Sequence, residues 1–139
     1  MSEPNNVDVV MSIYAAFSRG DVAAVLSLVG PDAELQFEGP SEVAWAGNWR
    51  GRQGWTTFFE TIGRHLDDVS LAMEPFAAQG DKVVVAGRYR GRVKRTGHRI
   101  DSPLVHLWTL QGGKVARCIE LTNTAAEASA CAPATATVP

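Results

Sequence analysis

The 139-residue chain has only two cysteines, Cys118 and Cys131. Two thiols are too few for a disulfide framework or a cysteine-based zinc site, and they favour a reducing, cytoplasmic compartment. The chain also lacks an apolar run of about 18 residues, the length a helix needs to cross a membrane. Its first residues are polar and contain no apolar segment, so the sequence predicts no secretory leader.

A basic excess is absent as well. Thirteen lysines and arginines stand against fifteen acidic residues, which gives a formal net charge of −2 at pH 7. We therefore expect neither a nucleic-acid partner nor binding to an anionic membrane surface. The motifs of zincins, P-loop proteins, dinucleotide-binding folds and serine hydrolases are missing. Histidines, cysteines and carboxylates show no metal-ligand spacing, so the simplest expectation is a pocket without metal or cofactor.

What the chain does contain is ordinary for one globular domain. Hydrophobic residues make up 45% and charged residues 20% of the sequence, and a chain of this length buries about 70% of its unfolded surface. The sequence predicts a single domain over residues 1–126. Residues 127–139 are rich in alanine, threonine and proline and are predicted to form a loosely held tail.

Apolar residues at helical spacing predict three helices in the N-terminal half. The first spans about residues 4–19 and the second about 21–29, with Gly20 between them. The third presents Trp55 and Phe58 on one face.

The apolar period then changes to two, which is typical of strands. The predicted strands lie around residues 35–37, 69–73, 83–93, 100–110 and 115–122, and residues 39–51 are expected to form a loop. Helices that are separated along the chain from a mostly antiparallel sheet indicate the α+β class.

Short sequence motifs in this order resemble the SnoaL-like, ketosteroid-isomerase-related branch of the nuclear-transport-factor-2-like superfamily. The motifs that carry the resemblance lie at residues 14–21, 31–33, 45–47, 80–85, 106–108 and 113–115. The resemblance covers about residues 7–126. It implies a cone, in which a curved antiparallel sheet wraps around the three helices and encloses an apolar pocket. It also implies a homodimer formed through the outer face of the sheet.

The catalytic residues of ketosteroid isomerase itself are not matched. That enzyme needs a carboxylate base, a tyrosine and a protonated aspartic acid. The three positions fall on Phe37, Ile13 and Val105, and a shift of one residue turns a strand side chain to the opposite face. True ketosteroid isomerase activity is therefore not expected.

The resemblance to SnoaL-like polyketide cyclases implies an acid/base carboxylate on the last strand and a histidine one strand earlier. Glu120 and His106 occupy the matching places, with glutamate in place of aspartate. A carboxyl inside an apolar cone suits a general acid or base near neutral pH. A two-residue turn at Gly112–Gly113, however, pairs Val105 with Glu120 and points His106 toward the dimer surface. A longer turn or a β-bulge would return His106 to the pocket.

Two functions follow from this reasoning. The first is a cofactor-independent acid/base enzyme of the isomerase, aldol cyclase or dehydratase type. It would act on a small, mostly apolar carbonyl or polycyclic compound, with Glu120 and His106 as catalytic residues. The alternative is a non-catalytic carrier or sensor of a small hydrophobic ligand, which Asn123 favours because many relatives have an aspartate there. In both cases the residues expected to contact the ligand are Tyr14, Phe37, Trp45, Arg50, Phe58 and Val105.

Overall fold

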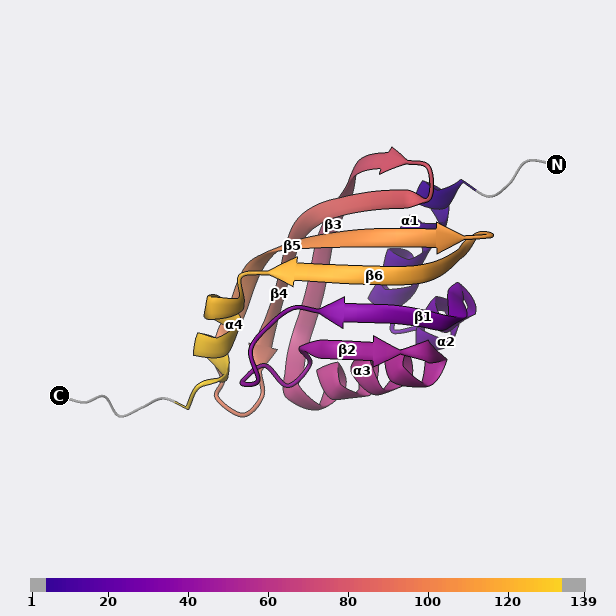
Figure 1. Cartoon of the computed structure of the whole chain (residues 1–139). Coiled ribbons are helices and arrows are strands. Elements are labelled where there is room, and N and C mark those ends of the chain that lie inside the picture. Colours follow the sequence, from indigo (N-terminus) through magenta and orange to yellow (C-terminus); the bar gives the residue numbers. More distant parts are fainter. Residues whose placement is uncertain (1–4, 134–139) are drawn as a thin grey trace.

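The computed structural model describes residues 5–133, which form four helices and one six-stranded sheet (Figure 1). The helices are α1 (Asn6–Ser18), α2 (Val22–Ser27), α3 (Gly51–His65) and α4 (Thr124–Cys131). The strands are β1 (Val29–Phe37), β2 (Gly47–Arg50), β3 (Leu66–Gln79), β4 (Lys82–Val93), β5 (Arg99–Gln111) and β6 (Lys114–Thr122).

The strands follow the order β2-β1-β6-β5-β4-β3 across the sheet. Neighbouring strands are antiparallel except β1 and β6, which are parallel, so the sheet is mixed. It curves but does not close into a barrel, and α1, α2 and α3 lie on its concave side (Figure 1). The predicted α+β cone is confirmed, with one parallel strand pair as a refinement.

Side-chain caps begin the first two helices, and a glycine separates them. The side chain of Asn5 accepts a hydrogen bond from the Val7 amide and caps α1, and Asp21 caps α2 through the Ala24 amide. Gly20 between the helices has φ +71°, a conformation that glycine adopts without steric cost. The buried stripe of α1 packs inward and turns Tyr14 toward the pocket.

Two elements were not predicted from the sequence. β2 lies in the segment expected to be a loop, and α4 crosses the predicted boundary between domain and tail. Within α4, Glu127 is completely buried and Cys131 is 6% exposed, so residues 127–131 pack onto the domain. The last part of the predicted tail, residues 134–139, lies outside the described residues.

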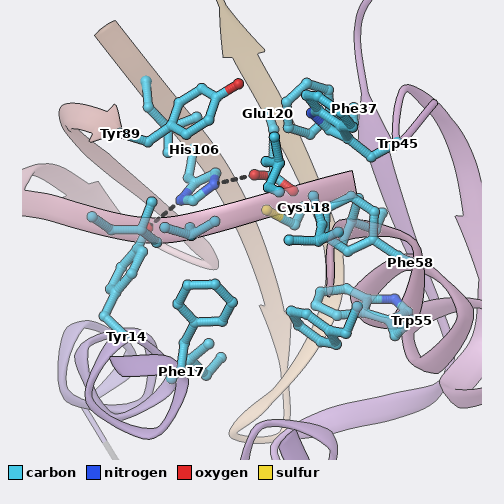
Figure 2. A pocket seen from close by; sticks show the side chains of 18 of the residues that line it. Tyr14, Phe17, Phe37, Trp45, Trp55, Phe58, Tyr89, His106, Cys118 and Glu120 are labelled. Carbon is cyan, nitrogen blue, oxygen red and sulfur yellow. Dashed lines mark hydrogen bonds and ion pairs between the residues drawn. The ribbon is translucent and has the colours of Figure 1, made fainter. Parts of the chain in front are cut away.

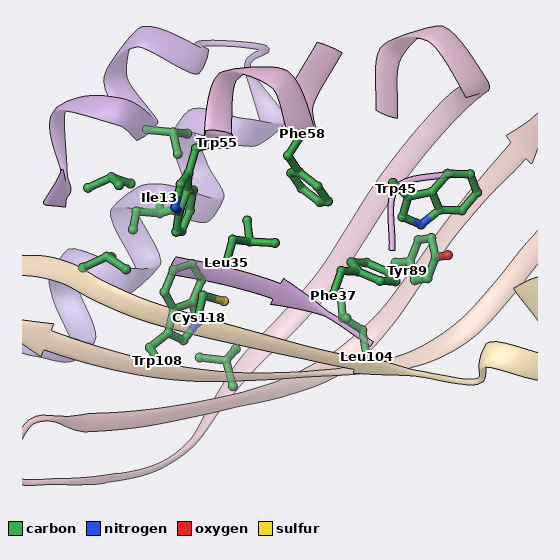
Figure 3. Close-up of a cluster of buried hydrophobic side chains, with 14 of the residues drawn as sticks. Ile13, Leu35, Phe37, Trp45, Trp55, Phe58, Tyr89, Leu104, Trp108 and Cys118 are labelled. Carbon is green, nitrogen blue, oxygen red and sulfur yellow. The ribbon is translucent and has the colours of Figure 1, made fainter. Parts of the chain in front are cut away.

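The core fills the space between the helices and the concave face of the sheet (Figure 3). Trp55 of α3 is 1% exposed, and its indole N–H donates to the Ala33 carbonyl of β1 at 3.2 Å. Val10 and Val25 are fully buried, and each such side chain contributes about 1.5–3 kcal/mol relative to exposure. This core holds β1, β5 and β6 at a fixed distance from α1 and α3, and the pocket lies between them.

Within the described part of the chain, no helix has the length and hydropathy needed to cross a membrane.

Candidate active site

A pocket opens on the concave side of the sheet, between the sheet and helices α1 and α3 (Figure 2). Aromatic and aliphatic side chains form almost all of its wall. Besides the Tyr89 hydroxyl and three tryptophan indoles, the lining residues that carry polar side-chain atoms are Tyr14, His106, Cys118 and Glu120. The pocket is therefore apolar, and its chemically active groups are gathered in one place.

The cavity is narrow, with a volume of about 80 Å³. For comparison, an engineered cavity that binds benzene has a volume of about 150 Å³, so we expect a ring-sized ligand to move some wall side chains aside. Apart from Tyr14, which hydrogen bonds hold in place, the partly exposed lining residues come from α1, α3 and β3 and are the ones free to do so: Phe17, Phe59, Ile62, Val69 and Leu71.

His106 and Glu120 form a hydrogen-bonded pair in this pocket. They are directly opposite each other on β5 and β6, and His106 Nε2 lies 2.6 Å from Glu120 Oε1. His106 is 5% exposed and Glu120 is 8% exposed. A carboxyl and an imidazole in contact, away from bulk water, are the components of a general acid/base pair.

A β-bulge brings these two residues together. Near the Gly112–Gly113 turn the strands pair as a two-residue turn requires, with Leu110 opposite Val115. The register then shifts by one residue, so that Thr109 faces Arg117 and His106 faces Glu120. Of the two registers that the sequence left open, the bulged one is present, and His106 faces the pocket instead of the outer surface.

A chain of hydrogen bonds fixes the imidazole from its other side. The Trp108 indole N–H donates to the Tyr14 hydroxyl oxygen at 3.0 Å, and that hydroxyl lies 2.5 Å from His106 Nδ1. Since the indole can only donate, the Tyr14 proton is free to point at Nδ1. The network thus assigns the proton of a neutral His106 to Nε2, which donates it to Glu120.

Burial keeps the neighbouring groups neutral. Desolvation raises the pKa of Tyr14, and the hydrogen bond from Trp108 only partly opposes this effect. Burial, with the nearby Glu120 as a smaller cause, also raises the pKa of the Cys118 thiol. At neutral pH the Tyr14 phenol therefore remains a hydrogen-bond donor, and Cys118 remains a thiol rather than a thiolate nucleophile.

A second buried carboxyl, Glu127 of α4, was missed at the sequence level. It accepts hydrogen bonds from the Tyr89 hydroxyl, the Thr122 hydroxyl and the Trp45 indole. Burial is the largest effect on Glu127 and raises its pKa. Tyr89 and Trp45 both line the pocket, so α4 holds part of the pocket wall in place. The alanine-rich composition around Glu127 concealed this role.

The predicted ligand contacts divide into two groups. Tyr14, Phe37, Trp45 and Phe58 line the pocket, as do His106 and Glu120. Arg50 and Val105 do not belong to the lining, and this corrects the expectation for both residues. The Arg50 side chain is 73% exposed and lies 3.5 Å from Glu34. Val105 pairs with Leu121 on the opposite face of β5 from His106.

The structure also brings together three side chains that the sequence did not suggest as a group. The ligand-type atoms of His106, Cys118 and Glu120 all lie within 4.8 Å of one another. Cys118 and Glu120 are two residues apart on β6 and so share a face, but His106 joins them only because of the β-bulge. No spacing along the chain reveals such a cluster.

Comparisons with known proteins agree with the fold. The model of the SnoaL-like domain family matches residues 10–118. The uncharacterised protein Rv0034 of Mycobacterium tuberculosis is 31% identical over 121 residues, covering 86% of this chain and 90% of the relative.

Two solved structures extend this similarity. An NTF2-like protein of Burkholderia xenovorans is 31% identical with a TM-score of 0.83, covering 95% of this chain and 99% of its own. TerC, crystallised with polyporic acid, is 28% identical with a TM-score of 0.83, covering 91% of this chain and 97% of its own. The fold and the family support a domain that binds small molecules. Since the family model spans most of the described residues, the chain belongs to the SnoaL-like domain family.

Proposed function

We propose that this protein is an acid/base enzyme that needs no cofactor and acts on a small, mostly apolar carbonyl compound. The observation that carries the proposal is the buried hydrogen bond of 2.6 Å between His106 and Glu120, at the polar end of an otherwise apolar pocket. Burying a carboxyl and an imidazole costs stability that a binding wall alone does not require. Proton transfer explains why both groups are present.

In the proposed mechanism Glu120 moves the proton. Its Oε1 is held by His106, which leaves Oε2 to take a proton from the carbon next to the substrate carbonyl. The electron pair of the broken C–H bond then forms an enolate. Return of the proton to another carbon gives isomerisation, whereas attack of the enolate on a second carbonyl gives an aldol product. Both outcomes begin with this step.

His106 and Tyr14 orient the base. Tyr14 donates to Nδ1 while His106 donates from Nε2 to Glu120, so the imidazole is held in one orientation and one tautomer. Nε2 already carries the proton that it donates to Oε1, so the proton taken from the substrate stays on Glu120 Oε2 until it returns to the product. Stable orientation of the base is required because small displacements of a reacting group reduce rates strongly.

The aromatic wall and the narrow cavity favour a flat ligand. Phe37, Phe58 and Trp55 present rings to the pocket, and aromatic rings stack or meet edge to face. TerC shares this fold and was crystallised with polyporic acid. Polyporic acid, planar phenols and polycyclic ketones are therefore the first probes for this pocket.

A non-catalytic carrier of a small hydrophobic ligand is the second candidate function. The apolar lining favours it, because such a wall binds flat apolar molecules whether or not a proton is moved. The two functions differ in what they require of Glu120. A carrier depends on the wall, whereas an enzyme depends on the carboxylate.

The variant Glu120→Gln separates the two. Glutamine keeps an oxygen that can accept from His106, so we expect stability within about 1 kcal/mol of wild type. Loss of the base is expected to reduce turnover of an enolisable ketone by about 100-fold to 10,000-fold. Exchange of substrate C–H for deuterium, followed by NMR, measures the proton-transfer step whichever product the reaction finally gives.

The matched control is Glu38→Gln, which changes an exposed glutamate just after β1. It should exchange deuterium at the wild-type rate. Full exchange activity in Glu120→Gln would refute the proposed mechanism. Ligand binding that is equal in wild type and Glu120→Gln, with no exchange in either, would identify a carrier.

A further inference from the structure

We propose that His106, Cys118 and Glu120 form a binding site for a zinc-like divalent cation at the polar end of the pocket. The three side chains are buried, and their ligand-type atoms lie within 4.8 Å of one another. In Figure 2 the Cys118 sulfur lies beside the carboxyl of Glu120, and the imidazole points toward the same space. This inference goes beyond the proposed function and does not depend on catalysis.

The spacing of the three groups is close to what a tetrahedral ion requires. Bond lengths of about 2.0–2.3 Å to zinc place two ligand atoms about 3.3–3.6 Å apart. The 2.6 Å contact between His106 and Glu120 is shorter than this, and the 4.8 Å limit for the whole cluster is longer. Movements of less than about 1.5 Å in the ligand atoms therefore bring all three onto one ion.

The chemistry of the ligands selects the class of metal. Imidazole nitrogen, thiolate sulfur and carboxylate oxygen together suit zinc or cobalt, whereas magnesium and calcium require oxygen ligands. A thiolate and a carboxylate carry two negative charges, which balance the two positive charges of the ion. The loaded site is therefore neutral, as the surrounding apolar wall requires. The proton of the Cys118 thiol leaves when the metal binds.

A hydrogen-bond partner for the other nitrogen of the imidazole is already present. A metal-bound histidine normally makes a hydrogen bond through its other ring nitrogen. His106 Nδ1 already contacts the Tyr14 hydroxyl, which Trp108 holds in place. To bind an ion through Nε2, His106 takes the tautomer with the proton on Nδ1, and the Tyr14 hydroxyl changes from donor to acceptor. Both tautomers of His106 keep the hydrogen bond between Nδ1 and the Tyr14 hydroxyl oxygen.

Metal binding replaces the hydrogen bond between His106 and Glu120. The ion would occupy the polar end of the pocket, where a carbonyl ligand would otherwise contact Glu120. It would have three protein ligands and a fourth coordination position that faces the pocket. If Glu120 is the base of the proposed function, zinc is expected to inhibit the enzyme.

The direct test is titration of the full chain with Co²⁺ under reducing, oxygen-free conditions. A cysteine ligand produces a thiolate-to-cobalt charge-transfer band in the near ultraviolet, and four-coordinate cobalt produces intense visible bands. We expect both bands in wild type and their loss when Zn²⁺ displaces the cobalt. The readout does not involve activity, so failure of the proposed function and failure of this site are separate results.

The two cysteines of the chain provide a matched pair of variants. Cys118→Ser should lose the charge-transfer band, whereas Cys131→Ser should keep it. Cys131 is also buried, but it lies in α4. Tyr14→Phe should keep the band and bind Co²⁺ about 10-fold to 100-fold more weakly. Circular dichroism confirms that each variant is folded. No thiolate band in wild type, or an unchanged band in Cys118→Ser, would overturn the proposal.

Discussion

Replacing Tyr14 by phenylalanine removes a single hydroxyl from the interior and keeps the ring. In the wild-type protein that hydroxyl accepts from the Trp108 indole at 3.0 Å and lies 2.5 Å from His106 Nδ1. The variant leaves a buried indole N–H and a buried imidazole nitrogen without this partner. Each orphaned group costs about 1–3 kcal/mol, so the two together are expected to lower the free energy of unfolding by about 2–6 kcal/mol. For a chain of this size the melting temperature should fall by about 6–18 °C.

Urea denaturation of Tyr14→Phe measures this loss, with Ser12→Ala as the control. Ser12 lies two residues earlier on α1, is exposed, and bonds only the Asp8 carbonyl of its own helix. Its removal should change stability by no more than about 0.5 kcal/mol. A double-mutant cycle with Glu120→Gln then tests the hydrogen-bond chain, because residues of one network show coupling of about 0.5–3 kcal/mol. A loss in Tyr14→Phe below about 0.5 kcal/mol, or zero coupling, would contradict the network described above.

Other perturbations test the rest of the molecule. Burial raises the pKa of Glu127 from 4.5. The stability that the protonated Glu127 carboxyl contributes is therefore complete below pH 4.5 and decreases as the pH rises through the raised pKa. Glu127→Gln should flatten the resulting decline of the melting temperature with pH. In Gly87→Ala the new Cβ would lie 1.9 Å from the Ala72 carbonyl oxygen of β3, so the β3–β4 pairing must distort and we expect a loss of more than about 3 kcal/mol or insoluble protein. Phe76 is 78% exposed, so Phe76→Ser should lower the free energy of unfolding, measured by urea denaturation, by less than about 0.5 kcal/mol. A larger loss would mean that Phe76 packs against other residues in solution.

The parts of the fold that the sequence predicted are those with strong periodicity. The stripe in α1 and the alternation in β4 and β5 each extend over more than ten residues, so tertiary contacts do not override them. β2 was missed because Gly47–Arg50 is only four residues long and three of them are exposed. It forms because β1 offers a free edge, to which Trp49 pairs opposite Leu35. α4 was missed because its burial depends on Glu127, a residue type that seldom packs in a core.

The candidate site was predictable only in part. Glu120 could be recognised as a polar residue in an apolar strand, because that contrast is local. The place of His106 depended on whether one residue of β6 bulges out of the ladder, and such a bulge has no strong sequence signal when no glycine marks it. Cys118 was weighed only against a disulfide framework and a cysteine-based zinc site, and it fitted neither. Its contact with His106 is a property of the strand register, which reasoning on each strand alone does not provide.

The β-bulge at Ala116 of β6, opposite Thr109 and Leu110, therefore determines the chemistry of this pocket. Without it, Val105 would face Glu120, and the imidazole would lie on the outer surface of the sheet. The pocket would then contain one carboxyl with no partner, a costly arrangement in an apolar wall. With it, the carboxyl, the imidazole and the thiol converge beneath the Tyr14 hydroxyl. Acid/base catalysis and metal binding both require that convergence, and passive binding of an apolar ligand does not. Ala116 is the residue of β6 that has no partner on β5, so its deletion gives a regular ladder in which Arg117 still faces Thr109 and Glu120 still faces His106. The deletion variant should therefore keep both deuterium exchange and the thiolate–cobalt band. Loss of both signals in a folded deletion variant would show that the register does not control the site.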